Sequence, residues 1–320
     1  MIKKNPSPRN RTLTVNESEC KKLLKCCLDK NSFPADSKDL QNKIICGDFF
    51  EIAPFLPENF ADLVIADPPY NMHKSFNGNV FSQLSEEKYA EYTRKWLALV
   101  KKVLKPDGSI YICCDWKSSL IIGNVLQEFF TLRNRITWQR EKGRGAKANW
   151  KNSSEDIFFA TAGNDYKFNL QAVKQRRKVL APYKDNGSPK DWQSDGKLKY
   201  RDTCPGNFWD DITVPFWSMP ENTAHPTQKP EKLFAKLILA GSDPGDLIFD
   251  PFAGSGTSCV TAKKLNRNYT GIEIDPLYCS WCEKRLQNAS NDPEIQGFYD
   301  GVFWERNSAP QQSFKKGDEK

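Results

Sequence analysis

From residue 43 onward, short apolar runs alternate with longer segments whose apolar residues recur every three or four positions. The runs predict strands at 43–46, 62–66, 109–114, 135–138, 156–161, 246–250 and 269–274. The segments between them predict helices at 49–56, 85–105, 118–130, 230–242, 255–265 and 276–289. This alternation predicts an α/β fold with a Rossmann-like, doubly wound, mostly parallel sheet.

Three parts of the chain lack the alternation. Residues 1–40 are polar, which predicts a loose N-terminal arm or a short appended helix. Residues 163–224 are rich in Lys, Asp, Gly, Pro and Trp and show no sustained period, so together with the loop 141–152 they indicate an insertion. The tail 291–320 is polar, and its end is expected to be disordered.

The composition narrows the class of protein. A chain of 320 residues with 38% hydrophobic residues can bury one large core or two small ones. It has no run near the roughly 20 apolar residues of a membrane span, and no apolar segment follows the basic start as in a secretory signal. The ten cysteines are unevenly spaced, and two pairs of them are adjacent in sequence. Reduced thiols and a cytoplasmic location are expected.

The positive charge is concentrated in one stretch. The whole chain has a formal net charge of +7, whereas residues 133–201 alone hold 17 Lys and Arg against seven Asp and Glu. A local basic excess of this size attracts polyanions, of which nucleic acid is the usual one. The alternative on charge alone is a solvated surface without a partner.

Asp67-Pro68-Pro69-Tyr70 follows the second predicted strand and has unusual chemistry for a strand end. The two prolines remove two N–H donors and fix the backbone, so the loop offers the Asp67 carboxylate and the Pro68 carbonyl as acceptors. Two fixed acceptors match the two hydrogens of an exocyclic amine, and Tyr70 adds a flat face on which a base can stack. The alternative is a rigid structural turn with a helix-capping aspartate.

A second loop, Asp250 to Thr257, contains Gly254 and Gly256 and lies between a predicted strand and a predicted helix. Such glycines allow close approach of the backbone to a ligand, although they are also common in purely structural turns. Glu273 ends the next strand about 20 residues later, where an acid can bind ribose hydroxyls. Asp275 is expected to cap the last helix instead.

Together these strings resemble the β-type amino-group DNA methyltransferases, which use S-adenosylmethionine. Asp67 to Tyr70 resembles their catalytic motif, Asp250 to Thr257 their methionine-binding motif, and His225 to Pro230 their other cofactor motif. The order, with the catalytic motif first and the cofactor motifs last, is that of the β type. The resemblance covers roughly residues 43–289.

The resemblance implies a role for each matching residue. Asp67, Pro68, Pro69 and Tyr70 form the catalytic motif, in which Asp67 and Pro68 hold the target amine and Tyr70 stacks on the base. The residues implied to contact S-adenosylmethionine, besides Asp67, are Asp250, Phe252, Ala253, Gly254 and Ser255 at the methionine end, Glu273 at the ribose, Asp48 at the adenine end, and Thr227, Gln228 and Lys229 closing over it. No metal site is expected, and Cys279-x-x-Cys282 is interpreted as structural because zinc sites usually need four ligands.

The resemblance also divides the chain. The catalytic half is expected at 41–140, a target-recognition insertion at 141–222, and the cofactor-binding half at 223–290, with the strand at 156–161 returning to the core. The expected partner is double-stranded DNA, whose target base must leave the duplex to reach the methyl group. A cognate restriction endonuclease is a further expected partner unless the enzyme is an orphan. A monomer or homodimer, associated with the nucleoid and not with a membrane, is expected.

Three functions remain open at this stage. Methylation of adenine at N6 is favoured, because Asp at the head of the tetrapeptide leans toward adenine. Methylation of cytosine at N4 on the same scaffold is the alternative, because the two amines present a similar edge. A catalytically silent DNA-binding protein is the third possibility, against which intact Asp67, Tyr70 and Gly254 argue.

Overall fold

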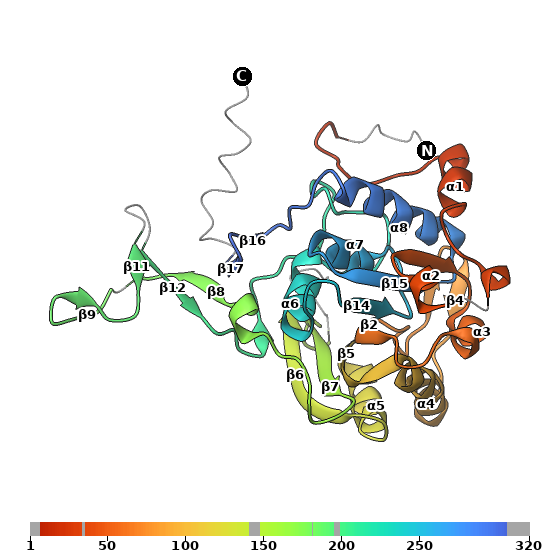
Figure 1. Cartoon of the computed structure of the whole chain (residues 1–320), viewed down its shortest axis with the longest axis horizontal. Helices are drawn as coiled ribbons and strands as arrows, with labels where there is room; N and C mark the ends of the chain where they lie inside the picture. The colour runs from red at the N-terminus through yellow and green to blue at the C-terminus, as the bar shows by residue number, and fades with distance from the viewer. Residues whose placement is uncertain (1–6, 34–35, 141–147, 181, 195–198, 306–320) are drawn as a thin grey trace.

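The computed structural model describes residues 7–33, 36–140, 148–180, 182–194 and 199–305. Parts of three expected segments lie outside the described residues: the start of the arm 1–40, the start of the insertion 141–222 and the end of the tail 291–320. Figure 1 shows a main body built around a twisted sheet, from which a narrow arm extends to the left of the view.

The main sheet has the strand order β1-β15-β14-β2-β5-β7-β6-β13. Neighbouring strands pair in parallel, except that β7 runs antiparallel to both β5 and β6. This arrangement confirms the predicted mostly parallel α/β fold. The strands are β1 (Lys43–Cys46), β2 (Ala61–Ala66), β5 (Leu104–Cys114), β6 (Thr131–Gln139), β7 (Ser154–Thr161), β13 (Phe208–Trp209), β14 (Leu247–Asp250) and β15 (Asn268–Glu273).

Helices cover both faces of this sheet (Figure 1). One face packs against α3 (Phe49–Ile52), α4 (Glu86–Val103) and α5 (Trp116–Leu126). The other packs against α6 (Glu231–Gly241), α7 (Thr257–Lys264) and α8 (Pro276–Ala289). Among the helices of the described ranges, none has the length and hydrophobicity of a membrane span.

The residues at the N-cap positions explain where several helices begin. Asp115 accepts a hydrogen bond from the Ser118 backbone N–H at 3.0 Å, so α5 starts at Trp116, two residues before the predicted position. Gly256, at φ 76°, is the N-cap of α7, which therefore starts after the predicted position 255. Asp275 caps α8 through the Leu277 N–H at 2.8 Å, as predicted.

The core is continuous through the sheet because both of its faces are buried. Successive residues of a strand point to opposite faces. Ile45 of β1 and Val64 of β2 pack with the cluster beneath α3, α4 and α5, whereas Ile44 and Leu63 pack with the cluster beneath α6, α7 and α8. Burial on both sides accounts for strands that are apolar runs and not alternating patterns.

A small second sheet replaces the irregular structure expected in the insertion and the tail. Its order is β11-β12-β8-β17-β16, and β17 pairs in parallel with β8. Its strands have two to five residues, too few for a detectable period, and the pairing joins segments remote in sequence. The strands are β8 (Gln175–Lys178), β11 (Gln193–Ser194), β12 (Lys199–Thr203), β16 (Phe298–Tyr299) and β17 (Val302–Trp304), with a separate hairpin of β9 (Lys184–Asp185) and β10 (Ser188–Pro189).

The described part of the N-terminal arm packs on the body. Glu19 of α1 (Glu17–Leu24) forms an ion pair with Lys284 of α8 at 2.6 Å, and Leu23 is buried. Leu28 forms a bridge with Ile45 of β1. The arm therefore covers the β1 edge of the sheet. The remaining short elements are η1 (Lys30–Ser32), α2 (Ser37–Leu40), η2 (Ala53–Phe55), β3 (Lys74–Phe76), β4 (Asn79–Phe81) and η3 (Leu170–Val173).

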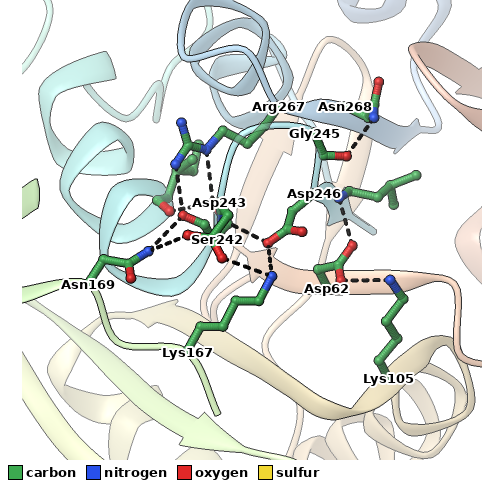
Figure 2. Close-up of polar contacts among 12 residues, drawn as sticks. Asp62, Lys105, Lys167, Asn169, Ser242, Asp243, Gly245, Asp246, Arg267 and Asn268 are labelled. Carbon is green, nitrogen blue, oxygen red and sulfur yellow. Dashed lines mark hydrogen bonds and ion pairs between the residues drawn. The ribbon is translucent and has the colours of Figure 1, made fainter.

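A polar network fastens the amino ends of the central strands (Figure 2). The Asp62 carboxylate accepts from Lys105 Nζ at 2.7 Å and from the Leu247 N–H at 2.9 Å, which joins β2, β5 and β14. Lys167 forms ion pairs with Asp246 at 2.6 Å and Asp243 at 3.2 Å. The network is completed by hydrogen bonds of Asn169 and Arg267 to Ser242 and of Asn268 to Gly245. It fixes the register of β14 against β2 at the end opposite the loops that carry the predicted motifs.

We predict that Trp96→Ala destabilises the fold strongly. Trp96 of α4 is fully buried, and its ring meets the Phe252 ring edge-on at 5.7 Å. Loss of such a side chain costs about 3–5 kcal/mol. Urea unfolding measures the change, with Trp116→Ala, whose side chain is half exposed, as the control. Equal stability of the two variants would contradict the assigned core.

Candidate active site at the carboxyl edge of the sheet

The carboxyl ends of β1, β15, β14 and β2 surround a cavity of about 330 Å³. Because these strands are parallel, the loops that follow them meet at one edge of the sheet. The cavity is lined by all the residues for which the motifs imply a role: Asp48, Asp67, Pro68, Pro69, Tyr70, Thr227, Gln228, Lys229, Asp250, Phe252, Ala253, Gly254, Ser255 and Glu273. The proline corner and the glycine corner thus face each other across one space.

The loop after β2 is held rigidly from below. The Pro69 carbonyl accepts from Tyr89 Oη of α4 at 2.9 Å. Asn71 receives the Leu84 N–H at 2.8 Å and donates to the Leu84 carbonyl at 3.0 Å, and its own N–H donates to Ser118 Oγ at 3.0 Å. These anchors supplement the two prolines in fixing Asp67 at the cavity wall.

Both oxygens of the Asp67 carboxylate have donors. Lys229 Nζ lies 2.6 Å from Oδ2, and Tyr70 Oη donates to Oδ1 at 2.9 Å. The Tyr70 ring lies beneath the same ammonium, 5.4 Å from Nζ to the ring centre. Lys229 is therefore a direct partner of Asp67, in addition to lining the cofactor cavity.

A second carboxylate, which the motifs did not indicate, stands behind this pair. Glu155 of β7 lies 3.3 Å from Lys229 Nζ and 3.2 Å from Tyr70 Oη, whose one proton can go to Glu155 or to Asp67, and Arg140 pairs with the other Glu155 oxygen. Burial opposes the charge on Lys229, but Asp67 and Glu155 together raise the pKa of its ammonium. Burial, followed by the same two carboxylates, raises the pKa of Tyr70 well above its ordinary value.

The signal for Glu155 was present in the sequence but weak. Two acids, Glu155 and Asp156, stand at the head of an apolar run, where a charge at the start of a strand usually only faces solvent. The side chain of Glu155 is 4% exposed, so its charge is buried and paired. Only the topology, which inserts β7 beside β5, brings it to Asp67.

In the glycine corner, the backbone approaches its neighbours closely. Gly254 has φ 55°, and a Cβ there would lie 3.1 Å from His225 Nε2. Glu273 accepts from the N–H groups of Gly254 and Asp275, each at 2.8 Å, with one carboxylate oxygen for each. Burial raises the pKa of Glu273 to about 8, although these two donors act in the opposite direction.

Buried charges support the glycine loop from beneath. Asp250 accepts from the Phe252 N–H at 2.9 Å and from the Ser258 hydroxyl, while burial raises the pKa of its carboxyl to about 7. Arg285 of α8 donates to the Ser255 carbonyl at 2.8 Å and pairs with Glu231 at 2.9 Å. The motifs had not indicated Arg285, because it lies inside a helix with no unusual neighbours in sequence.

The segment before α6 forms the roof of the cavity. The side chain of Gln228 accepts from the Thr223 N–H at 2.8 Å and donates to the Glu221 carbonyl at 2.6 Å, so it holds its own loop in place. His225 packs edge-on against Tyr278 at 4.6 Å between ring centres, and burial lowers its pKa to about 4. His225 is therefore neutral near pH 7.

The side of the cavity at the ends of β1 and β15 has two acids, Asp48 and Asp275. Asp48 caps α3, accepting from the Phe50 N–H at 2.7 Å, and the remaining lone pairs of its carboxylate face the cavity. Across the mouth, Asn77 of the β3–β4 turn donates to both oxygens of Asp275, at 2.9 and 3.2 Å. Residues 74–81 thus form a hairpin over the same opening.

These residues fit a ligand with a nucleoside at one end and an amino acid at the other. Glu273 presents a carboxylate beside Gly254, whose positive φ and close contact with His225 disfavour a Cβ, and the cavity extends from Asp48 to the loop at Gly254. No grouping of three or more His, Cys, Asp or Glu side chains with the geometry of a metal site occurs in the described parts of the chain.

Comparisons with known proteins agree with this geometry. The profile of the N6/N4 DNA methylase family matches residues 61–284. The chain is 32% identical over 262 residues to the type II methyltransferase M.HpaI of Haemophilus parainfluenzae, covering 81% of this chain and 77% of that protein. It is 33% identical over 255 residues to the DNA adenine methyltransferase YhdJ of Escherichia coli, covering 78% and 83%.

A solved structure shares the fold. The cytosine-N4-specific PvuII DNA methyltransferase superposes with a TM-score of 0.56 at 21% identity, covering 78% of this chain and 92% of that one. At this identity the likeness concerns the fold alone. Family match, sequence identity and cavity together identify the chain as a member of the DNA methylase family that its motifs indicate, the S-adenosylmethionine-dependent methyltransferases of adenine N6 and cytosine N4.

Proposed function

We propose that this enzyme transfers the methyl group of S-adenosylmethionine to the N6 amine of adenine in duplex DNA. One observation carries the proposal: the acceptor corner at Asp67 and Pro68 and the glycine corner at Gly254 line the same cavity. A methyl donor held at one corner and an amine held at the other would be within reach of each other. The remaining lining residues supply contacts suited to a nucleoside.

Adenine is preferred over cytosine on two grounds. The tetrapeptide begins with Asp, which leans toward adenine, and the relative YhdJ is named a DNA adenine methyltransferase. Cytosine N4 is the second candidate, because its amine has a similar edge and the PvuII enzyme, which is cytosine-N4-specific, shares the fold. Two acceptors at Asp67 and Pro68 suit either amine.

In the proposed mechanism, Asp67 and the Pro68 carbonyl accept the two N–H groups of the target amine. This localises the nitrogen lone pair, which is otherwise delocalised into the ring, and aims it at the methyl carbon. S-adenosylmethionine, held by the loop at Gly254 and by Glu273, would supply an electrophilic sulfonium methyl group, with a thioether that would leave with the carbon–sulfur bonding pair. The nitrogen then loses one proton, for which Asp67 is the adjacent base. Such positioning contributes at most about 7–11 kcal/mol.

We further propose that residues 141–222 select the DNA sequence. The arm built by β8 to β12 projects from the body, and its Lys178, Lys184, Lys190 and Lys199 are exposed (Figure 1). Exposed Tyr183 adds an aromatic surface beside these charges. A base in a duplex must leave the stack to reach Asp67, at a cost of a few kcal/mol that contacts of this arm would offset.

The biological setting is also a proposal. The M.HpaI relative is named a type II methyltransferase, so we propose that the chain methylates the recognition site of a cognate restriction endonuclease, with an orphan enzyme as the alternative. In either setting it would act on cytoplasmic, nucleoid DNA.

Expression in a host without DNA methylation tests the proposed activity. Mass spectrometry of the nucleosides from that host's DNA is expected to detect N6-methyladenine. N4-methylcytosine would establish the second candidate, and unmodified DNA together with cofactor binding would contradict both.

We predict that Asp67→Ala abolishes methyl transfer while cofactor binding remains. Removal of one preorganised group at a reacting centre costs at least about 100-fold in rate, because the amine loses its charged acceptor. Radiolabelled methyl transfer measures the rate, and calorimetry measures the Kd. Asp107→Ala, at an exposed position near the start of β5, is the control. Near wild-type transfer by the Asp67 variant would refute the assigned role.

The raised pKa of Glu273 gives cofactor binding a pH dependence. Ribose hydroxyls donate to the ionised carboxylate, so protonation competes with binding and affinity rises with pH up to about 8. Below this value we expect the Kd to weaken by about tenfold per pH unit. Glu273→Gln is expected to bind more weakly and to lose this slope. A slope retained in the variant would belong to the cofactor's own amine and would remove Glu273 from the ribose site.

We predict that reversing two charges at the tip of the arm weakens DNA binding. Lys184→Glu with Lys190→Glu is expected to lower affinity and to reduce the slope of log K against log salt by about two. The Kd for S-adenosylmethionine is expected to stay unchanged. The matched control is Lys22→Glu with Lys25→Glu, on and beside the remote helix α1. Equal weakening in both double variants would mean that the arm has no special part in DNA binding.

A further inference from the structure

The site contains a row of four alternating charges, of which the middle two are buried. Lys229 lies between Asp67, at 2.6 Å, and Glu155, at 3.3 Å, and Arg140 pairs with Glu155 from the far side. The side chains of Lys229 and Glu155 are each 4% exposed. The catalytic motif supplies Asp67, and the other three residues come from the position directly after β6, from β7 and from the roof segment.

This arrangement weakens Asp67 as an acceptor in the reaction that the proposed function requires. Asp67 must accept an N–H from the target amine, yet Lys229 already donates to Oδ2 and Tyr70 already donates to Oδ1. The amine and the ammonium are competing donors for the same carboxylate oxygen. Each carboxylate oxygen can accept a second hydrogen bond, so the amine can share Oδ2 with the ammonium, but the ion pair at 2.6 Å makes Asp67 a weaker acceptor for the amine.

Lys229 is the donor with another anion within reach. A buried ammonium without a counter-ion is costly, so Lys229 cannot simply be withdrawn into an apolar wall. Glu155 already lies 3.3 Å away, with its second oxygen held by Arg140. Tyr70 can stay, because its hydroxyl lies within hydrogen-bond distance of both carboxylates and its one proton can pair with either of them.

A second cavity provides space for the movement. It measures about 230 Å³ and is lined by Trp138, Arg140, Glu155, Thr223 and Lys229 among others. Lys229 lines both this cavity and the one between the two motif loops, whereas Glu155 lines this cavity. The Arg140 Nε in the same wall is buried without a hydrogen-bond partner among the described residues. Its N–H can therefore donate to Glu155 if that side chain shifts.

The movement also suits the charge changes of the reaction. Methyl transfer carries positive charge from sulfur to the target nitrogen. An ammonium held 2.6 Å from Asp67 would neutralise the carboxylate that stabilises this charge. An ammonium drawn toward Glu155 leaves Asp67 as an unshared anion beside the nitrogen.

We propose that Glu155 is a positioning residue that draws Lys229 away from Asp67 when the target amine enters. This inference rests on the proposed function. It predicts that methyl transfer requires a negative charge at position 155, and not only a side chain of the right shape.

Variants of Glu155 separate charge from shape. Glu155→Gln keeps size and hydrogen bonding but removes the charge, whereas Glu155→Asp keeps the charge and shortens the side chain. We expect the single-turnover rate of methyl transfer to fall at least about tenfold in the Gln variant and less in the Asp variant. The Kd values for S-adenosylmethionine and for unmethylated plasmid DNA are expected to change less than about twofold in both.

The order of activities decides the matter. Glu above Asp above Gln supports the proposal, whereas Gln equal to wild type, Gln above Asp, or losses that follow cofactor affinity would overturn it. Glu128→Gln, which removes an exposed pair with Arg94, is the control. If Glu155→Gln does not fold, Glu155→Asp against Glu155→Asn makes the same comparison at equal size. An inactive wild-type enzyme would instead contradict the proposed function.

Discussion

The parallel pairing of β14 with β2 is the constraint on which the site depends. Leu63 pairs with Ile248 and Val64 with Phe249, although the two strands are separated by more than half of the chain. The pairing places the loop at Asp67 beside the loop at Gly254. The Asp62–Leu247 hydrogen bond, which joins positions 185 residues apart, fixes the register from the other end of the strands. A slip of register by one residue would exchange the side chains that face the two helical layers and displace the two loops relative to each other.

At the carboxyl end of these strands, the site holds charged side chains that are largely shielded from water. Lys229 would be unfavourable there alone, as would Asp67 or Glu155. Together they form ion pairs. Because these pairs are largely buried, a new hydrogen-bond donor or acceptor that enters the site changes their energies strongly. The arriving amine is such a donor. A structure that is stable when empty and rearranges on binding therefore follows from the same ion pairs, without a change in the surrounding sheet.

Much of the fold and of the cavity lining could be predicted from the sequence, because these features are local. Apolar runs marked the main strands, and Asp67-Pro68-Pro69-Tyr70 and the loop at Gly254 have chemistry visible in a few residues. The features that escaped prediction are non-local. The pairing of β17 with β8 joins strands of three and four residues, and Glu155 reaches Asp67 only through the placement of β7. The ion pair between Lys229 and Asp67 joins residues 162 positions apart, which only the folded structure brings together.

The central claim is that one cavity brings the target amine to Asp67 while the methyl donor is held at the glycine corner. A crystal structure of the enzyme with duplex DNA and S-adenosylhomocysteine tests this most directly. The account predicts an extruded base whose amine donates to Asp67 and the Pro68 carbonyl, with the sulfur atom of the product facing that amine. An amine bound elsewhere, or a sulfur atom remote from Asp67, would contradict it.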